Sequence, residues 1–461
     1  MEFEASYNER VSESQTVEKH EPRHSAHRGE DGRVIRTEAM FRALRHRNFQ
    51  LFFSGQLISL IGTWMQNLAQ SWLVYRLTGS ALLLGVVGFS GQIPVFIFAP
   101  LGGMIADRRS RHRVVIATQT ISMILAFILA GLTLAHKITV PEIIILAVLL
   151  GIVNAFDIPA RQAFLGDMVH RDDLMNAIAL NSSMFNGARV VGPAVAGVLV
   201  AWIGEGWCFF ANAISYIAVI VGLLLMTIAK HHHTPTSSPY EHIAEGFRFV
   251  RRTKPIRALL LLLGCISLLA LPYSVLMPIF ADRILHGGAR GYGILMGCAG
   301  LGALGGALTL AMRTGMRGLG RWIAIACASF GTALIAFSFS RTFWLSAVLL
   351  VPAGYAVMLQ TSASNSLLQA MSPNSLRGRV LAVYSMMFMG MAPIGALLAG
   401  DVAKHIGAPL TVCFGGIGAI IGAAFFARIL PQFRMEAREL LIASGMAAGQ
   451  PPESLPARPA S

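Results

Sequence analysis

The sequence is poor in charged residues, which make up only 13% of its 461 positions, whereas 54% of the positions are hydrophobic. Soluble domains carry about a quarter charged residues, so a soluble globular fold could not bury this much apolar side chain. Runs of about 20 apolar residues recur instead, which is the length that an α-helix needs to cross a bilayer. Because backbone groups inside lipid must be satisfied internally, these runs predict helices and a polytopic membrane protein.

Cysteine is also scarce, and its five positions lie in apolar segments without paired spacing. Cysteines in such positions behave as small buried hydrophobic residues, so we predict neither disulfides nor a metal site. The chain lacks the Gly-Lys-Ser/Thr loop that cradles phosphates, so it does not itself hydrolyse nucleotide. Its apolar runs also lack the His, Asp or Cys spacing of an embedded enzyme. We therefore expect no enzymatic activity and no cofactor.

The apolar runs predict an all-α fold with about twelve spans. Their expected bounds are 49–76, 80–105, 113–135, 142–166, 175–202, 207–229, 258–281, 291–312, 322–340, 343–368, 380–403 and 409–430. This gives one six-helix bundle over 48–229 and a second over 258–431. Residues 1–47 are polar, have no signal-peptide core, and are predicted to form a disordered tail. Residues 432–461 form a second tail.

The positive charges flank the spans. The net charge of +14 could indicate nucleic-acid binding, but this placement explains it better, and we expect no nucleic-acid partner. Lys and Arg concentrate in the connections after even-numbered spans, for example Arg108 to Arg113 and Arg248 to Lys254. The richer side is cytoplasmic by the positive-inside rule, which predicts that both termini are cytoplasmic.

The longest connection, residues 230–257, divides the spans into six and six. It begins with Lys230 and three histidines at 231–233, which we interpret as part of a solvated linker rather than a metal site. From Tyr240 to Arg252, apolar residues share one helical face beside basic residues. This pattern predicts a short helix lying on the membrane surface.

The two halves are related by a repeat. When the sequence is shifted by 203 positions, Gly151 aligns with Gly354, Gly192 with Gly395, and Gly197 with Gly400. Some matches are expected by chance, because the shift is selected for its fit and both segments are apolar. The matches nevertheless cluster between Ser182 and Gly197. We therefore predict two related bundles. The charged residues of the first segment, which spans residues 151–200, all align with uncharged residues in the second.

The connection after the second span carries a candidate gating motif. It contains Gly103, then three intervening residues, then Asp107 and the basic residues Arg108, Arg111 and Arg113. A carboxylate beside guanidiniums can form a charge-assisted lock between helices, which can close in one conformation and open in another. The order resembles the signature loop of the major facilitator superfamily, although Ser110 and His112 depart from the usual residues. The alternative is an arginine cluster that only fixes topology.

A second motif lies in the fifth span. Gly192, Pro193 and Gly197, with alanine at three positions where glycine is usual, resemble the superfamily motif of antiporter-type exporters. Proline removes one backbone hydrogen bond and bends a helix. The second half has Ala396 where the first has Pro193, as in that family.

Further segments extend the resemblance across about residues 40–432. They include 62–66, 77–80, 157–162 and 176–182, and they resemble the bacterial branch of secretion permeases that contains the enterobactin exporter. This resemblance implies two six-helix bundles around a central cavity, alternating access, and a location in the bacterial inner membrane. It implies a small organic substrate, and we expect a monomer with protons as a possible coupling ion. Related transporters hold substrate near the midplane between the repeats.

Charged residues within spans are the coupling candidates. Arg189 lies at the centre of the fifth span, where an unpaired guanidinium costs about 2.5–3.5 kcal/mol. Asp157 and Arg161 lie in the fourth span. Counting from the turn at Arg171 puts Asp157 one turn from the level of Arg189, so we predict an interaction between them. Asp157 is either a proton-coupling group or part of a permanent structural pair.

Polar residues in four spans are candidates for substrate contact or for hydrogen bonding between helices. They should face inward, because each is costly in lipid. They are Gln66, Asn67, Gln70, Asn154, Tyr273, Gln360 and Asn365.

We interpret the chain as a secondary exporter of a siderophore, drug or metabolite. An importer or facilitator on the same fold is the main alternative, and an embedded enzyme or a channel is less consistent with the sequence. The sequence does not identify the substrate.

Overall fold

The protein is described by a computed structural model over residues 42–227, 239–313, 315–316, 318–373 and 376–443. Within these ranges every regular element is a helix, as predicted. Most of the predicted N-terminal tail, the three histidines of the linker and residues 444–461 lie outside the described residues.

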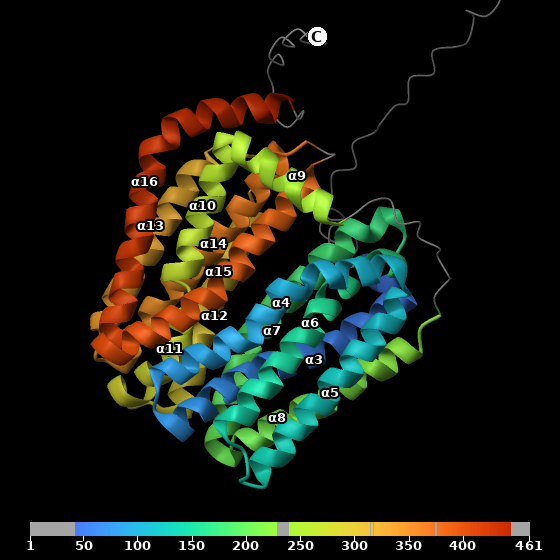
Figure 1. The fold of residues 1–461 in the computed structure, drawn as a ribbon, viewed down its shortest axis with the longest axis vertical. Coiled ribbons are helices and arrows are strands. Elements are labelled where there is room, and N and C mark those ends of the chain that lie inside the picture. The colour runs from blue at the N-terminus through green and yellow to red at the C-terminus, as the bar shows by residue number, and fades with distance from the viewer. Residues whose placement is uncertain (1–41, 228–238, 314, 317, 374–375, 444–461) are drawn as a thin grey trace, which may run out of the picture. The chain divides into compact units, whose positions relative to one another are not determined.

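Six long helices form the first bundle, and seven helical segments form the second (Figure 1). The first contains α3 (Arg47–Thr78), α4 (Ala81–Arg108), α5 (Arg111–Leu134), α6 (Val140–Met168), α7 (Leu174–Ile203) and α8 (Glu205–Leu224). The second contains α10 (Lys254–Leu269) with α11 (Tyr273–Ile279), then α12 (Gly288–Ala311), α13 (Leu319–Phe339), α14 (Phe343–Met371), α15 (Arg377–Ile406) and α16 (Ala408–Ala443). Shorter elements are η1 (Arg42–Arg45), η2 (Arg171–Asp173), α9 (Pro239–Arg252) and the π-helix η3 (Phe280–Ile284).

Eleven helices in the described part of the chain are long and apolar enough to cross a membrane, with α10 to η3 counted as one. The first predicted span corresponds to α3, which is not among these eleven but has 32 residues and a length of roughly 48 Å. It carries Gln56, Gln66, Asn67 and Gln70, and these amides make it more polar than the other spans. The prediction of about twelve spanning helices is therefore confirmed.

The two bundles repeat the same helix packing. In the first, α4 packs on α6, α5 on α8, and α3 on both α7 and α8. In the second, α12 packs on α14, α13 on α16, and α10 on both α15 and α16. The most extensive contacts between the bundles are also equivalent, α7 with α12 and α15 with α4. This correspondence is the pseudo-twofold arrangement that the sequence repeat predicts.

The repeat extends to single glycines at these two contacts. A Cβ at Gly197 would lie 2.7 Å from the Cα of Gly293, and a Cβ at Gly400 would lie 3.1 Å from the Cα of Gly85. The backbones therefore approach at distances that only glycine allows, as in small-residue membrane interfaces. Gly197 and Gly400 are the positions that the shift of 203 residues aligns.

The seventh span is broken, whereas the sequence predicted one continuous helix over 258–281. Helix α10 ends at Leu269, and α11 starts at Tyr273 after a turn that contains Pro272. Proline has no backbone N–H, and the chain closes the turn by short-range hydrogen bonds such as Tyr273 N–H to the Ala270 oxygen at 3.3 Å. The span then ends in the π-helix η3.

Two further helices extend outside the predicted spans, α9 entirely and α16 in part. A helix, α9, lies in the predicted linker, where Val250 is buried, and its place on the membrane surface stays a prediction. Glu245 of α9 forms an ion pair with Arg379, and Gly246 packs on the backbone of the same residue, which ties α9 to α15. Helix α16 continues beyond its predicted end at 430 to Ala443, because Phe433 is still buried against the bundle.

Candidate functional site

A buried polar network lies inside the first bundle around Asp157, whose exposed fraction is only 3%. Its Oδ1 accepts hydrogen bonds from the Thr118 hydroxyl at 2.7 Å and from the Gln119 amide at 2.9 Å. Its Oδ2 lies 3.4 Å from Nε of Arg161, one helical turn further along α6. A charge at this depth is tolerated only when it is paired and hydrogen-bonded. The network supplies both conditions and joins α5 to α6.

The predicted interaction between Asp157 and Arg189 is wrong for this structure. The Arg189 guanidinium lies over the Trp64 ring, with 5.7 Å between its central carbon and the ring centroid. The two residues lie on helices with different neighbours, because α6 packs mainly on α4 and α5 while α7 packs mainly on α3 and α12. Counting residues from a turn estimates the depth of a side chain, but it does not give the direction in which that side chain points.

The candidate contact residues of the first bundle have different environments. Gln66 is buried and its Oε1 accepts a hydrogen bond of 2.7 Å from Asn212, so it connects α3 to α8. Asn67 is exposed, whereas Gln70 and Asn154 are half-buried. Among the described residues, no side-chain hydrogen bond satisfies the amides of these three. They remain candidates for substrate contact, whereas the position of Gln66 fits a structural role.

The candidates of the second bundle are also divided. Tyr273 is buried at the start of α11, with its ring 6.0 Å from that of Phe330. Gln360 is fully buried, and its Oε1 has no hydrogen-bond partner among the described residues. Asn365 is half-buried and accepts a bond of 2.7 Å from Gln369 on the same helix. Gln360 is therefore the amide of this group with unused hydrogen-bonding capacity.

The antiporter-like motif lies on the part of α7 that contacts both bundles. A Cβ at Gly192 would lie 2.5 Å from Cβ of Trp64 on α3. One turn along, the backbone oxygen of Pro193 and the Cα of Gly197 adjoin Gly293 on α12. The motif thus allows α7 to pack closely on its own bundle and on the opposite one.

The gating motif is not locked in this structure. Asp107 is exposed and has no ion-pair partner among the described residues, and Arg108 and Arg113 are also exposed. Arg111 instead pairs with Asp167 of α6, with 3.1 Å between the charged atoms. A Cβ at Gly103 would meet no atom within 4 Å. The expected contact of Asp107 with a guanidinium is therefore absent from the described part of the chain.

Polar contacts between the bundles gather at the opposite end of α3 and α4. The Tyr75 hydroxyl donates to Oδ2 of Asp282 at 2.8 Å. Arg283 lies over the Tyr75 ring, and it donates to the backbone oxygen of Gly79 at 3.2 Å. We call Tyr75, Gly79, Asp282 and Arg283 the α3–η3 clasp. Its two hydrogen bonds join the end of α3 and the glycine that follows it to η3.

Replacing Tyr75 with phenylalanine is expected to weaken the clasp. The lost bond has a charged acceptor and contributes about 1.5–3 kcal/mol, which shifts the balance towards an open clasp by roughly tenfold or more. The rate at which a membrane-impermeant maleimide labels Asn67→Cys from the clasp side measures this shift. Tyr355→Phe is the matched control, because its hydroxyl bonds to Thr309 within the second bundle. Equal labelling rates in the two variants would show that the clasp does not control access.

Sequence reasoning missed the clasp and the partners of Asp157. Neither Asp282 nor Arg283 of the clasp was among the site residues that the sequence predicted. The signal for the clasp was an adjacent Asp–Arg pair, Asp282 and Arg283, on the side that is otherwise poor in charge. The signal for the buried network was the polar pair Thr118 and Gln119 inside an apolar run.

The comparisons with known proteins agree on one type of protein. A family model described as "Transmembrane secretion effector" matches residues 38–448. The staphyloferrin A transporter of Staphylococcus aureus is 27% identical over 84% of this chain and 98% of its own length. The multidrug efflux pump Tap of Mycolicibacterium fortuitum is 26% identical over 77% and 89%. The enterobactin exporter EntS of Shigella boydii is 25% identical over 84% and 93%.

Solved structures show a similar fold at lower sequence identity. A POT family transporter is 12% identical, with a TM-score of 0.70 over 84% of this chain and 96% of its own. The nucleoside transporter NupG is 15% identical, with a TM-score of 0.63 over 83% and 99%. At these identities the likeness concerns the fold alone.

Proposed function

Since the chain belongs to the transmembrane secretion effector family of the major facilitator superfamily, we propose that this transporter exports an acidic small molecule by alternating access. It is a multi-pass membrane protein of a bacterial transporter family rather than an enzyme. The export direction rests on relatives named as an enterobactin exporter and a multidrug efflux pump. The importer alternative lacks support of this kind.

Alternating access is supported by a difference between the two ends of the protein, one of which is closed and the other unlocked. The α3–η3 clasp is closed at one end, while Asp107 of the gating motif has no partner among the described residues at the other. Closure at one end and release at the other is what an alternating-access protein requires. By the positive-inside rule the unlocked end faces the cytoplasm, so this conformation receives substrate from the cytoplasm. Both termini then lie on that side.

The charge of the interior supports an acidic substrate. Arg189 is half-buried, and no carboxylate of the described residues lies within 4 Å of it. Asp157 of the same bundle is already paired with Arg161. A half-buried guanidinium without a carboxylate partner favours an anionic ligand, and siderophores carry carboxylate or catecholate groups. We propose that Arg189, with Asn67, Gln70, Asn154 and the residues of the second bundle, lines the path of such a molecule.

Everted membrane vesicles test this function directly. The expected result is uptake of an acidic siderophore, with staphyloferrin A and enterobactin as probes, that depends on an acidic vesicle interior. Ethidium serves as a cationic probe for the drug-pump alternative. Transport of ethidium alone would contradict the proposed substrate class, and uptake only into right-side-out vesicles would contradict the direction.

Replacing Arg189 with glutamine is expected to weaken binding of the acidic probe. A charge-assisted hydrogen bond contributes about 1.5–3 kcal/mol, so KM for the siderophore should rise by roughly tenfold or more while transport at saturating probe changes less. Arg341→Gln removes the same charge from an exposed position just before α14 and should leave KM unchanged. A KM for Arg189→Gln equal to that of Arg341→Gln would contradict a substrate role.

A further inference from the structure

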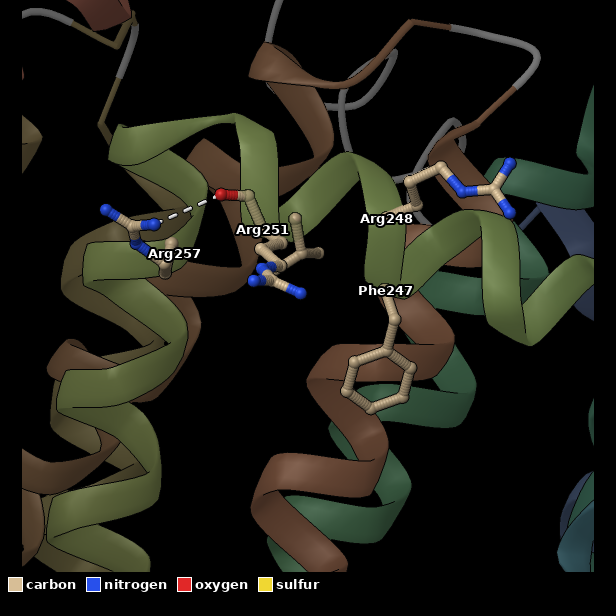
Figure 2. A pocket seen from close by; sticks show the side chains of 5 residues that line it. Phe247, Arg248, Arg251 and Arg257 are labelled. Atoms are coloured by element: carbon tan, nitrogen blue, oxygen red, sulfur yellow. Dashed lines mark hydrogen bonds between the residues drawn. The ribbon is translucent and has the colours of Figure 1, made fainter.

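We propose that the junction of α9 and α10 is a binding site for the headgroup of an anionic phospholipid of the phosphatidylglycerol class. The site is a hollow of about 520 Å³ lined by Phe247, Arg248, Val250, Arg251 and Arg257. Figure 2 shows Phe247 and Arg251 extending from α9, with Arg257 of α10 on the other side of Arg251. This inference needs only that the protein lies in a membrane, and it is independent of the substrate and of the export direction.

The charge of the hollow favours an anion. Five cations fall within residues 248–257, namely Arg248, Arg251, Arg252, Lys254 and Arg257. Lys254 lies 3.7 Å from Glu436, but among the described residues no carboxylate lies within 4 Å of the four arginines. Clusters of this size beside a spanning helix recognise acidic lipid headgroups.

The geometry holds two arginines in position. Nη1 of Arg257 donates to the backbone oxygen of Arg251 at 3.1 Å, as the dashed line in Figure 2 marks. This bond uses one of the five donors of the Arg257 guanidinium and leaves the others available. The Arg251 side chain is exposed and makes no hydrogen bond to another described residue. Both guanidiniums can therefore contact a phosphate at the mouth of the hollow.

The location fits a lipid rather than a soluble anion. The hollow lies where α9, a short helix outside the spans, meets the start of the spanning helix α10. A site at the start of a spanning helix is at headgroup depth. Phe247 is 40% exposed beside the arginines, and it offers an apolar surface to a glycerol backbone or an acyl chain. A free phosphate would make no use of this ring.

Binding would also stabilise the attachment of α9. Val250 of α9 is buried, and Glu245 of the same helix pairs with Arg379 of α15. A lipid bridging Arg251 and Arg257 would add a second attachment, between α9 and α10. The occupied site would then hold the linker helix against the second bundle.

Native mass spectrometry of the full-length protein in detergent tests the proposal. Phosphatidylglycerol is expected to bind more tightly than phosphatidylcholine. The double variant Arg251→Gln with Arg257→Gln should weaken phosphatidylglycerol binding by roughly tenfold to thirtyfold, given the effect of each basic residue near an anionic surface. The matched control is Arg428→Gln with Arg434→Gln, which removes two exposed charges from α16 and should leave the affinity unchanged. Elution volume and melting temperature check the folding of each variant.

A second variant separates a lipid from a soluble anion. Phe247→Ala keeps every charge and should weaken phosphatidylglycerol binding several-fold, whereas sn-glycerol 3-phosphate should not compete for the site in any variant. Effective competition by glycerol phosphate would overturn the lipid assignment. Equal binding of both lipids, or equal losses in the α9–α10 and α16 double variants, would overturn the site itself.

Discussion

Replacing Gly197 with alanine is expected to reduce transport by about tenfold or more, because the added methyl group would overpack the contact between α7 and α12. The new Cβ would lie 2.7 Å from the Cα of Gly293 and 3.1 Å from the Ala289 oxygen, both of them backbone atoms that cannot rotate away. Helices α7 and α12 must then move apart, and the two bundles lose their close packing at this contact. Initial rates of siderophore uptake into everted vesicles measure the loss.

The repeat provides a second test of the same contact. Gly400→Ala would place a Cβ 2.7 Å from the Ala81 oxygen at the equivalent contact of α15 with α4, and it should reduce transport in the same direction. Gly131→Ala is the matched control, since a Cβ there meets no atom within 4 Å and the position is exposed on α5. If Gly197→Ala transports as fast as Gly131→Ala, close approach of the bundles is not needed for the cycle.

Replacing Asp157 with asparagine is expected to abolish the dependence of transport on the pH gradient. The variant keeps an oxygen for the hydrogen bonds of Thr118 and Gln119, but it removes the group that can gain and lose a proton beside Arg161. Downhill exchange of the substrate, which needs no proton, should persist.

The control for this variant lies on the same helix. Glu142 lies at the start of α6, where it closes a capping box with Thr139 that glutamine can also form. Glu142→Gln should therefore retain the pH dependence. Because breaking a buried ion pair can cost about 3–5 kcal/mol, the melting temperature of Asp157→Asn is measured in parallel. A lower melting temperature with an intact pH response would assign Asp157 to the permanent structural pair and not to coupling.

Helix number and bundle symmetry were predictable because lipid imposes one solution on every apolar run. The break in the seventh span was not predictable from proline alone. Pro94 and Pro159 lie inside helices that continue past them, whereas Pro272 lies at a break. The difference depends on the surroundings, and Pro272 packs beside Gly395 of α15.

The candidate site was predictable in composition but not in pairing. The sequence identified Asp157, Arg161 and Arg189 as buried charges that need partners, since each is costly in lipid. It paired Asp157 with the wrong arginine, because sequence spacing does not determine which neighbour a helix face meets. The clasp joins residues 207 positions apart, Tyr75 and Asp282, and no local pattern connects them.

Paired distance measurements at the two ends test the central claim most directly. Spin labels at Leu77 and His286 report on the clasp end, and labels at Arg109 and Gly378 report on the gating-motif end, since all four positions are on the surface. The labels are introduced in a variant without the five native cysteines. Alternating access predicts that, on adding siderophore or lowering the pH, the clasp distance lengthens while the gating-motif distance shortens. Distances that change in the same direction at both ends, or at one end only, would contradict it.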